Sequence, residues 1–162
     1  MSSETAAEPG LRPHRAMAPY DWAAILTLIR AEFAYMEGRI DPPSSMLRLT
    51  EAAIADKADE GEVWVIGTPP RACVFLTPKG EALYLGKLAV AGAYRGQGLA
   101  RQLVELAASR ARARGLAAVE LEVRVELVEN QRAFAAMGFV ETERTAHSGY
   151  DRPTSITMRR PA

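Results

Sequence analysis

The chain has 162 residues, of which 48% are hydrophobic and 25% charged, as is usual for one globular domain. Lys and Arg together number 20, as do Asp and Glu, so the formal net charge is zero. A general nucleic-acid-binding or acidic-membrane surface is therefore not expected. The single cysteine, Cys73, excludes an internal disulfide and a metal site made of several cysteines.

No stretch reaches the apolar length of a membrane span, and the N-terminus lacks a signal-peptide core. We therefore expect a cytoplasmic protein, with a disordered tail over residues 1–10 and a single domain over residues 11–162. Cys73 lies in an apolar run and is expected to be a buried, unreactive thiol.

Apolar residues in the first part of the chain recur at the spacing of a helix. They predict a helix from about Pro19 to about Glu37, and its apolar residues are Trp22, Ile25, Leu26, Ile29, Phe33 and Met36. A turn-rich loop follows, and Thr50 is the candidate N-cap of a second helix that ends near Glu60.

Short apolar runs separated by turn residues predict the strands of one sheet. A turn at residues 78–80 leads into a central strand from about Glu81 to Val90, in which Gly86 suggests a bulge or a close backbone approach. Antiparallel strands precede the first strand–turn–helix unit, which argues against a doubly wound dinucleotide-binding fold. The other predicted strands are residues 11–17, 63–66, 72–76, 119–125, 139–145 and 154–159.

The strand over residues 119–125 alternates strictly with a period of two. Its valines and Leu121 are expected to face the core, while Glu120, Glu122 and Arg124 face the other way. A solvated sheet face and a polar row that lines a cleft both explain this pattern.

Residues 95–98, Arg-Gly-Gln-Gly, turn the chain from the central strand into a helix expected over residues 99–114, with Gly115 as its left-handed exit. The first amides of a helix have no internal partner and lie at the positive end of its dipole. Glycines let a ligand approach those amides, and the guanidinium of Arg95 suits phosphate oxygens. The turn is therefore predicted to bind a phosphate or pyrophosphate, and a plain tight turn is the alternative.

Two other phosphate-binding motifs do not fit these residues. A P-loop needs Gly-Lys followed by Ser or Thr, but Gly98 is followed by Leu99 and Ala100. A dinucleotide fingerprint needs a third glycine where Arg101 stands.

Residues 95–100, Arg-Gly-Gln-Gly-Leu-Ala, resemble the Arg/Gln-x-x-Gly-x-Gly/Ala signature of the GNAT superfamily of N-acetyltransferases. The resemblance extends over nearly the whole chain and includes Asn130 and residues 137–139, Met-Gly-Phe. It implies an α/β (α+β) fold of the GNAT-type acyl-CoA N-acyltransferase class, with a mostly antiparallel twisted sheet and helices on both faces. One parallel pair of strands is expected to splay apart at the cofactor.

The resemblance also implies an activity, which is transfer of the acetyl group of acetyl-CoA to a primary amine of an unidentified acceptor. Acetyl-CoA is then the cosubstrate, and no metal is needed. Homodimers are common in such folds, so a homodimer stands beside a monomer as an alternative.

In that family the glycine signature binds the pyrophosphate of the cofactor, and the strand before it pairs with the pantetheine arm. Asn130 opens a predicted short helix that ends at Met137; the resemblance gives it a contact to CoA, and helix capping is the alternative. The implied cofactor-binding residues are Leu88, Ala89, Val90, Arg95, Gly96, Gln97, Gly98, Leu99, Ala100, Arg101, Asn130 and Phe134.

The catalytic base remains open. An amine attacks only as the free base, so its proton must be removed. Glu122, Glu81 and His147 are the candidates, each with a structural alternative, and Glu122 is preferred. A backbone amide near Val90 is the candidate donor to the developing oxyanion.

The sequence departs from the family at the catalytic acid. Phe134 stands where the resemblance places a tyrosine, and a phenyl ring cannot donate a proton to the leaving thiolate. Tyr150, in the polar loop over residues 147–153, or water is predicted to supply that proton. A CoA-binding sensor or interaction protein without catalysis is the alternative function that Phe134 keeps open.

Overall fold

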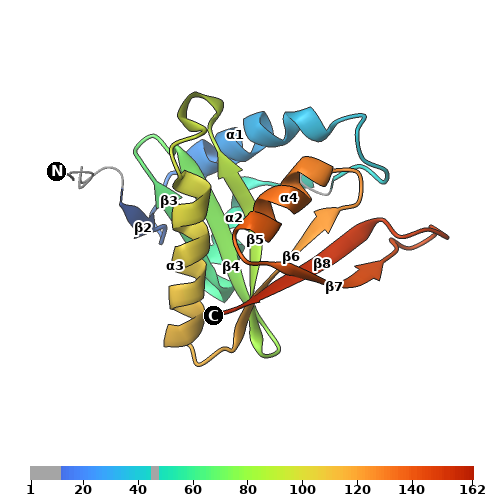
Figure 1. The fold of residues 1–162 in the computed structure, drawn as a ribbon. Coiled ribbons are helices and arrows are strands. Elements are labelled where there is room, and N and C mark those ends of the chain that lie inside the picture. Colours follow the sequence, from blue (N-terminus) through green and yellow to red (C-terminus); the bar gives the residue numbers. More distant parts are fainter. Residues whose placement is uncertain (1–11, 45–47) are drawn as a thin grey trace.

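The computed structural model describes residues 12–44 and 48–162. It has the expected mixed α/β architecture, with a seven-stranded sheet in the order β2-β3-β4-β5-β6-β8-β7 (Figure 1). The predicted tail over residues 1–10 lies outside the described residues. The strands are β2 (Pro13–Arg15), β3 (Glu62–Ile66), β4 (Ala72–Lys79), β5 (Ala82–Val90), β6 (Ala118–Arg124), β7 (Val140–Thr145) and β8 (Ser155–Pro161). The helices are α1 (Trp22–Phe33), α2 (Glu51–Glu60), α3 (Leu99–Ala113) and α4 (Val128–Ala136), with 3₁₀ turns η2 (Ala34–Met36) and η4 (Gly92–Tyr94).

The centre of the sheet holds one parallel pair among antiparallel neighbours. β5 and β6 pair in parallel from Ala82 opposite Ala118 to Tyr84 opposite Glu120. Beyond that point β5 continues beside β4 as far as Val90, and β6 continues beside β8. The two central strands therefore diverge, as the resemblance implied.

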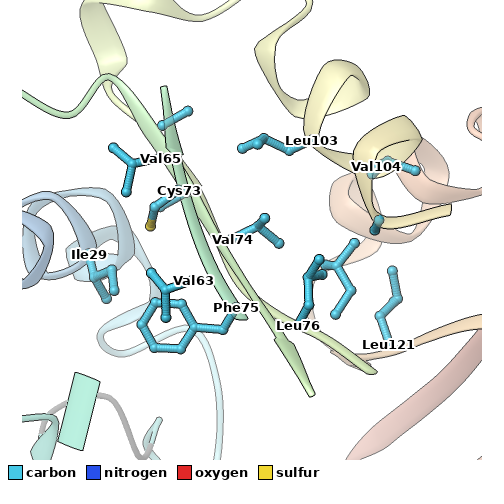
Figure 2. Close-up of a cluster of buried hydrophobic side chains, with 14 of the residues drawn as sticks. Ile29, Val63, Val65, Cys73, Val74, Phe75, Leu76, Leu103, Val104 and Leu121 are labelled. Atoms are coloured by element: carbon cyan, nitrogen blue, oxygen red, sulfur yellow. The ribbon is translucent and has the colours of Figure 1, made fainter. Parts of the chain in front are cut away.

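Helices cover both faces of the sheet. α1 and α2 pack against each other and against β3, β4 and β5, while α3 packs on β4, β5 and β6. Figure 1 shows α3 in front of the sheet and α2 behind it. Alternate side chains of β4 serve the two sides: Cys73 and Phe75 point toward Ile29 of α1, and Val74 points toward Leu103 of α3 (Figure 2).

The predicted burial of Cys73 is confirmed. The side chain is fully buried, and that burial raises the pKa of the thiol to about 12. A thiol that stays protonated at neutral pH is a poor nucleophile.

Several predicted boundaries shift for local reasons. α1 starts at Trp22 because Asp21 caps it, with its carboxylate accepting from the Ala24 amide at 3.2 Å. The α-helix ends at Phe33 rather than near Glu37, since its last turn tightens into η2. Thr50 caps α2 as predicted, accepting from the Ala53 amide at 3.1 Å.

Two other predictions are wrong at the strand and helix ends. Pro78 lies inside β4 opposite Leu83 rather than in the hairpin turn, a position near the strand end where the missing N–H is tolerated. The helix predicted to open at Asn130 starts at Val128 instead, with Leu127 as its N-cap, so the alternative that Asn130 caps it does not hold either. Its amide therefore serves another partner.

A buried carboxylate anchors the C-terminal end of α3. Glu62 at the start of β3 is fully buried and accepts hydrogen bonds from Trp64 Nε1 at 2.8 Å, Arg110 Nε at 2.7 Å and Arg114 Nε at 2.7 Å. Burial alone would raise the pKa of Glu62. The hydrogen bonds from Arg110, Trp64 and Arg114 outweigh it and lower the pKa to about 2.

Glu62→Gln is expected to reduce the free energy of unfolding by about 3 kcal/mol, because two guanidinium groups lose a buried partner. Since the folded pKa lies below the ordinary 4.5, the wild-type stabilisation is present above that pH and is lost as the pH falls toward 2. Urea unfolding at pH 7 and pH 3 measures both effects. Glu105→Gln, which removes an exposed ion pair with Arg160, is the control and is expected to cost less than about 1 kcal/mol. Equal midpoints for wild type and Glu62→Gln at pH 7 would contradict the expectation.

Candidate active site

β5 carries a bulge beside the point where the central strands diverge. Cys73 pairs with Ala89 and Phe75 with Gly86, so one residue of β4 faces both Lys87 and Leu88. Lys87 has a left-handed φ of +51°, and no other non-glycine among the described residues has a positive φ. Of the two features suggested at Gly86, the bulge is therefore present, at the residues that directly follow Gly86. Such an insertion bends the strand and frees backbone groups from the ladder.

The glycine turn leads from β5 into α3 with its amides uncovered. Gly96 and Gly98 have φ values of +79° and +81°, and Gly98 is the N-cap of α3 without a side-chain hydrogen bond. An added Cβ at either glycine meets no other atom within 4 Å. The first helical hydrogen bond is made by Gln102, which leaves three earlier helical amides free to face a ligand. This open, positive helix end fits a pyrophosphate.

A cavity of about 680 Å³ lies beside this turn. It is lined by β5, the turn, the start of α3, the end of α1 and one face of α4. Of the predicted cofactor-binding residues, all except Gln97 line this cavity. They are Leu88, Ala89, Val90, Arg95, Gly96, Gly98, Leu99, Ala100, Arg101, Asn130 and Phe134. Residues distant in sequence are thereby brought together, and the volume is in the range of a cofactor site.

A second cavity of about 280 Å³ occupies the space between the diverging strands. Glu122 and Arg124 line it from β6, and Tyr84 and Lys87 from β5. For Glu122 and Arg124 the structure therefore supports the alternative in which the polar row lines a cleft, whereas Glu120 does not line this cavity and pairs with Lys79 at 3.3 Å. Four residues line both cavities and define their junction: Phe33, Leu88, Asn130 and Phe134.

Arg95 is held at the rim of the larger cavity by a residue far away in sequence. Its Nη2 lies 2.5 Å from Glu32 Oε1, and the other oxygen of Glu32 accepts from the Gly92 amide at 3.1 Å. The Arg95 side chain is 61% exposed. Exposed ion pairs are weak, so a phosphate can compete for this guanidinium.

The candidate bases are in different surroundings. Glu122 lines the smaller cavity. Burial of Tyr84 is the main cause that raises the pKa of Tyr84 to about 12, and the charge of Glu122 is the second cause. His147 also lines that cavity, with its ring Nδ1 against Thr154 Oγ1. Glu81 instead pairs with Arg159 at 2.9 Å and lines neither cavity.

Tyr150 lines neither of the two cavities. Its hydroxyl donates to Asp41 Oδ1 at 2.6 Å, and this hydrogen bond is the main cause that raises its pKa. The role of Tyr150 as the proton source remains a prediction. The contact itself joins the β7–β8 loop to the loop after α1.

One wall of the larger cavity is formed by residues that no sequence motif predicted. Tyr35 and Arg39 line it from η2 and the turn that follows, and Glu129 lines it from α4. Asn130 Nδ2 donates to the Tyr35 hydroxyl at 3.0 Å, and Arg39 lies 2.6 Å from Glu129. No local motif marks these residues. Only the adjacency of Glu129 to Asn130 hinted at one of them.

The chain matches the model of the Acetyltransferase (GNAT) family over residues 22–139. The match covers most of the chain, and the fold and the uncovered glycine turn agree with it. The chain therefore belongs to this family of acetyltransferases. No curated protein sequence matches it.

Solved structures show the same fold at low sequence identity. A GNAT-family acetyltransferase from Staphylococcus aureus has a TM-score of 0.72 at 14% identity, covering 93% of this chain and 98% of that one. The ribosomal-protein-S18-alanine N-acetyltransferase of Escherichia coli has a TM-score of 0.66 at 20% identity, and the match covers 93% of this chain and 94% of that one. A chain of the NatC complex bound to Gag peptide and CoA has a TM-score of 0.67 at 21% identity, and the match covers 94% of this chain and 98% of that one.

Two further observations concern the described part of the chain. None of its helices is long and apolar enough to cross a membrane. Within the same residues, no group of three or more His, Cys, Asp or Glu side chains is arranged to hold a metal ion.

Gly98→Ala is expected to weaken acetyl-CoA binding at least about tenfold, because the new methyl group stands over the amides that face the pyrophosphate. Gly115→Ala is the matched control, since Gly115 ends the same helix with φ +71° and equally open space. Both variants lose about 1–2 kcal/mol of stability from the left-handed alanine. Calorimetric titration and thermal melting separate the two effects. Equal affinities in the two variants would place the pyrophosphate elsewhere.

Arg95→Ala is expected to weaken the binding of CoA by about 1.5–3 kcal/mol, because a charge-assisted contact to the phosphates is lost. A pantetheine fragment without the pyrophosphate should bind wild type and variant alike. Arg112→Ala, in the exposed last turn of α3, controls for the loss of one positive charge. If the fragment and CoA weaken equally, Arg95 does not contact the phosphates.

Proposed function

We propose that this acetyltransferase moves the acetyl group of acetyl-CoA to a primary amine. One observation carries the proposal: two cavities meet where β5 and β6 diverge, one beside an uncovered helix end and the other polar. Such an arrangement admits a phosphate-bearing donor from one side and an acceptor from the other. The reacting groups then meet at the junction residues.

The donor side binds and orients acetyl-CoA, which supplies an acyl group already activated as a thioester. The amides at the start of α3 and the Arg95 guanidinium face its pyrophosphate. The backbone of Leu88, Ala89 and Val90, next to the bulge, pairs with the pantetheine arm. Phe134 packs against that arm from α4.

The acceptor side must hold an amine and remove a proton from it. Glu122 is the carboxylate that lines the smaller cavity, and none of the ion pairs among the described residues includes it. We assign it the role of base, acting directly or through water. A backbone amide near Val90 stabilises the negative charge that develops on the acetyl oxygen.

The smaller cavity limits the acceptor more than the fold does. At about 280 Å³, it suits a small amine or the end of a chain, while the body of a larger acceptor stays outside. The structural relatives include an enzyme that acts on the alanine of a ribosomal protein. We therefore include peptide N-termini beside small amines among the acceptors to be tested.

We also propose that the protein works in the cytoplasm, where acetyl-CoA is available to it, and cell fractionation tests this. A homodimer is compatible with the proposal but is not required by it. Both cavities are formed by residues of a single chain.

Two measurements test the proposed function. Acetyl-CoA is expected to raise the melting temperature, since a ligand at about 100 times its Kd adds about 2.7 kcal/mol of stability. Steady release of free thiol is expected with a panel of primary amines and N-terminal peptides, and not with matched alcohols. Binding without thiol release from any amine would favour a CoA sensor, and no thermal shift at millimolar acetyl-CoA would remove the cofactor assignment.

A further inference from the structure

The leaving group needs a proton source that Phe134 cannot provide. When the amine takes the acetyl group, the C–S bond breaks and its electron pair stays on sulfur. The sulfur must lie near the junction, because only there does the donor cavity open into the acceptor cavity. Of the four junction residues, Phe33, Leu88 and Phe134 have purely apolar side chains, and the amide of Asn130 is not an acid.

The chain has five tyrosines, and the structure gives each hydroxyl a different environment. Tyr20 contacts His14 Nε2 at 2.8 Å, and Tyr150 donates to Asp41 at 2.6 Å. Tyr94 also lines the larger cavity, with its ring against Arg71, whose guanidinium carbon lies 4.4 Å from the ring centroid. Burial, together with the nearby charges of Glu122 and Glu120 on β6, raises the pKa of Tyr84 to about 12.

Tyr35 is the remaining tyrosine, and its hydroxyl contacts Asn130, one of the four junction residues. It lines the larger cavity from η2, and its oxygen accepts a hydrogen bond from Asn130 Nδ2 at 3.0 Å. Asn130 precedes Phe134 by one helical turn on the same face of α4, so the phenol lies beside the position of Phe134. The hydroxyl accepts in this contact. No acceptor takes its own proton among the described residues.

A charged side chain and solvent both contact Tyr35. Arg39 lies over the ring, with its guanidinium carbon 5.6 Å from the centroid, and is itself held 2.6 Å from Glu129. The Tyr35 side chain is in contact with solvent, at 38% exposure, so water can return the proton.

We propose that Tyr35 is the catalytic acid, which donates its hydroxyl proton to the departing sulfur of CoA. The inference rests on the proposed acetyl transfer. In the step, the N–C bond forms, the C–S bond breaks, the electron pair goes to sulfur, and the phenol proton goes to the thiolate. Solvent then reprotonates the phenolate, and the proton from the amine leaves through the base.

Tyr35→Phe is expected to lower kcat by about 10²-fold, at the lower end of the range for general acid help because a thiolate leaves tolerably without it. The KM for acetyl-CoA should change little. Tyr20→Phe, whose hydroxyl lies outside both cavities, is the control for the loss of a phenol and should keep full activity. Melting temperatures of all variants show whether each is folded.

Phe134→Tyr in the Tyr35→Phe background is the rescue variant. It places a phenol on α4, one turn from Asn130 and on the same face of that helix, and should recover part of the lost turnover. A structural role for the Tyr35–Asn130 contact would not be repaired in this way, because the new hydroxyl comes from α4 itself.

A second readout does not depend on turnover. Tyr35 should donate to the thiolate of bound CoA and stabilise it, so the bound thiol should ionise about one pH unit higher in Tyr35→Phe than in wild type. Ultraviolet absorbance of the thiolate during a pH titration of the CoA complex measures the shift. Tyr20→Phe should match wild type.

The outcomes separate this inference from the proposed function. If wild type releases no thiol with any amine, acetyl transfer fails as the function, while the thiol titration still tests the position of Tyr35. If a folded Tyr35→Phe variant turns over and titrates like wild type, Tyr35 is not the acid. The inference is also overturned if Tyr35→Phe loses turnover without a thiol shift or rescue, or if only Tyr150→Phe loses it.

Discussion

The divergence of β5 and β6 after Tyr84 and Glu120 is the constraint on which the rest of the site depends. Parallel strands normally continue side by side, and here each central strand instead keeps only its antiparallel partner. The bulge at Lys87 and Leu88 bends β5 in the same region. The gap that results is where the two cavities meet, so the strand geometry determines where donor and acceptor come together.

The anion site arises from local backbone dipoles and not from the charge of the protein as a whole. The formal net charge is zero, yet α3 presents three unpartnered amides at its N-terminal end. The other end of α3 is fixed to β3 by the buried carboxylate of Glu62 and two arginines. The position of the positive helix end therefore depends on an ion-pair cluster at the far end of the helix. A buried pair of this kind holds a definite geometry, because leaving any member unpaired is costly.

The contacts between η2 and α4 give the larger cavity its remaining wall. Tyr35 with Asn130, and Arg39 with Glu129, join segments about 90 residues apart in the chain. These exposed contacts contribute little to stability. Their importance lies in position, because they hold a phenol and a guanidinium in the wall of the larger cavity, against the helix that carries Phe134. The smaller cavity is bounded in a related way, since Arg124 Nη1 donates to the Pro42 carbonyl at 2.6 Å and holds the loop after α1 against β6.

The sequence by itself determined the features that follow from local chemistry. Periodicity predicted α3 and the alternation of β6, glycine geometry predicted the turn at residues 95–98, and Gly86 predicted the bulge. Each depends on dihedral preferences and hydrogen bonds of neighbouring residues, which are written in the chain order. The family signature added the cofactor and the parallel pair.

Only the tertiary structure decided which distant side chains share a cavity. Glu32 reaches Arg95 across 63 positions, and Tyr35 reaches Asn130 across 95, through packing that no local pattern records. The same reason explains why Tyr150, attractive by composition and loop position, contacts Asp41 instead of the junction. Backbone preferences act over a few residues, whereas the site is made by the sheet order and by helices that meet across it.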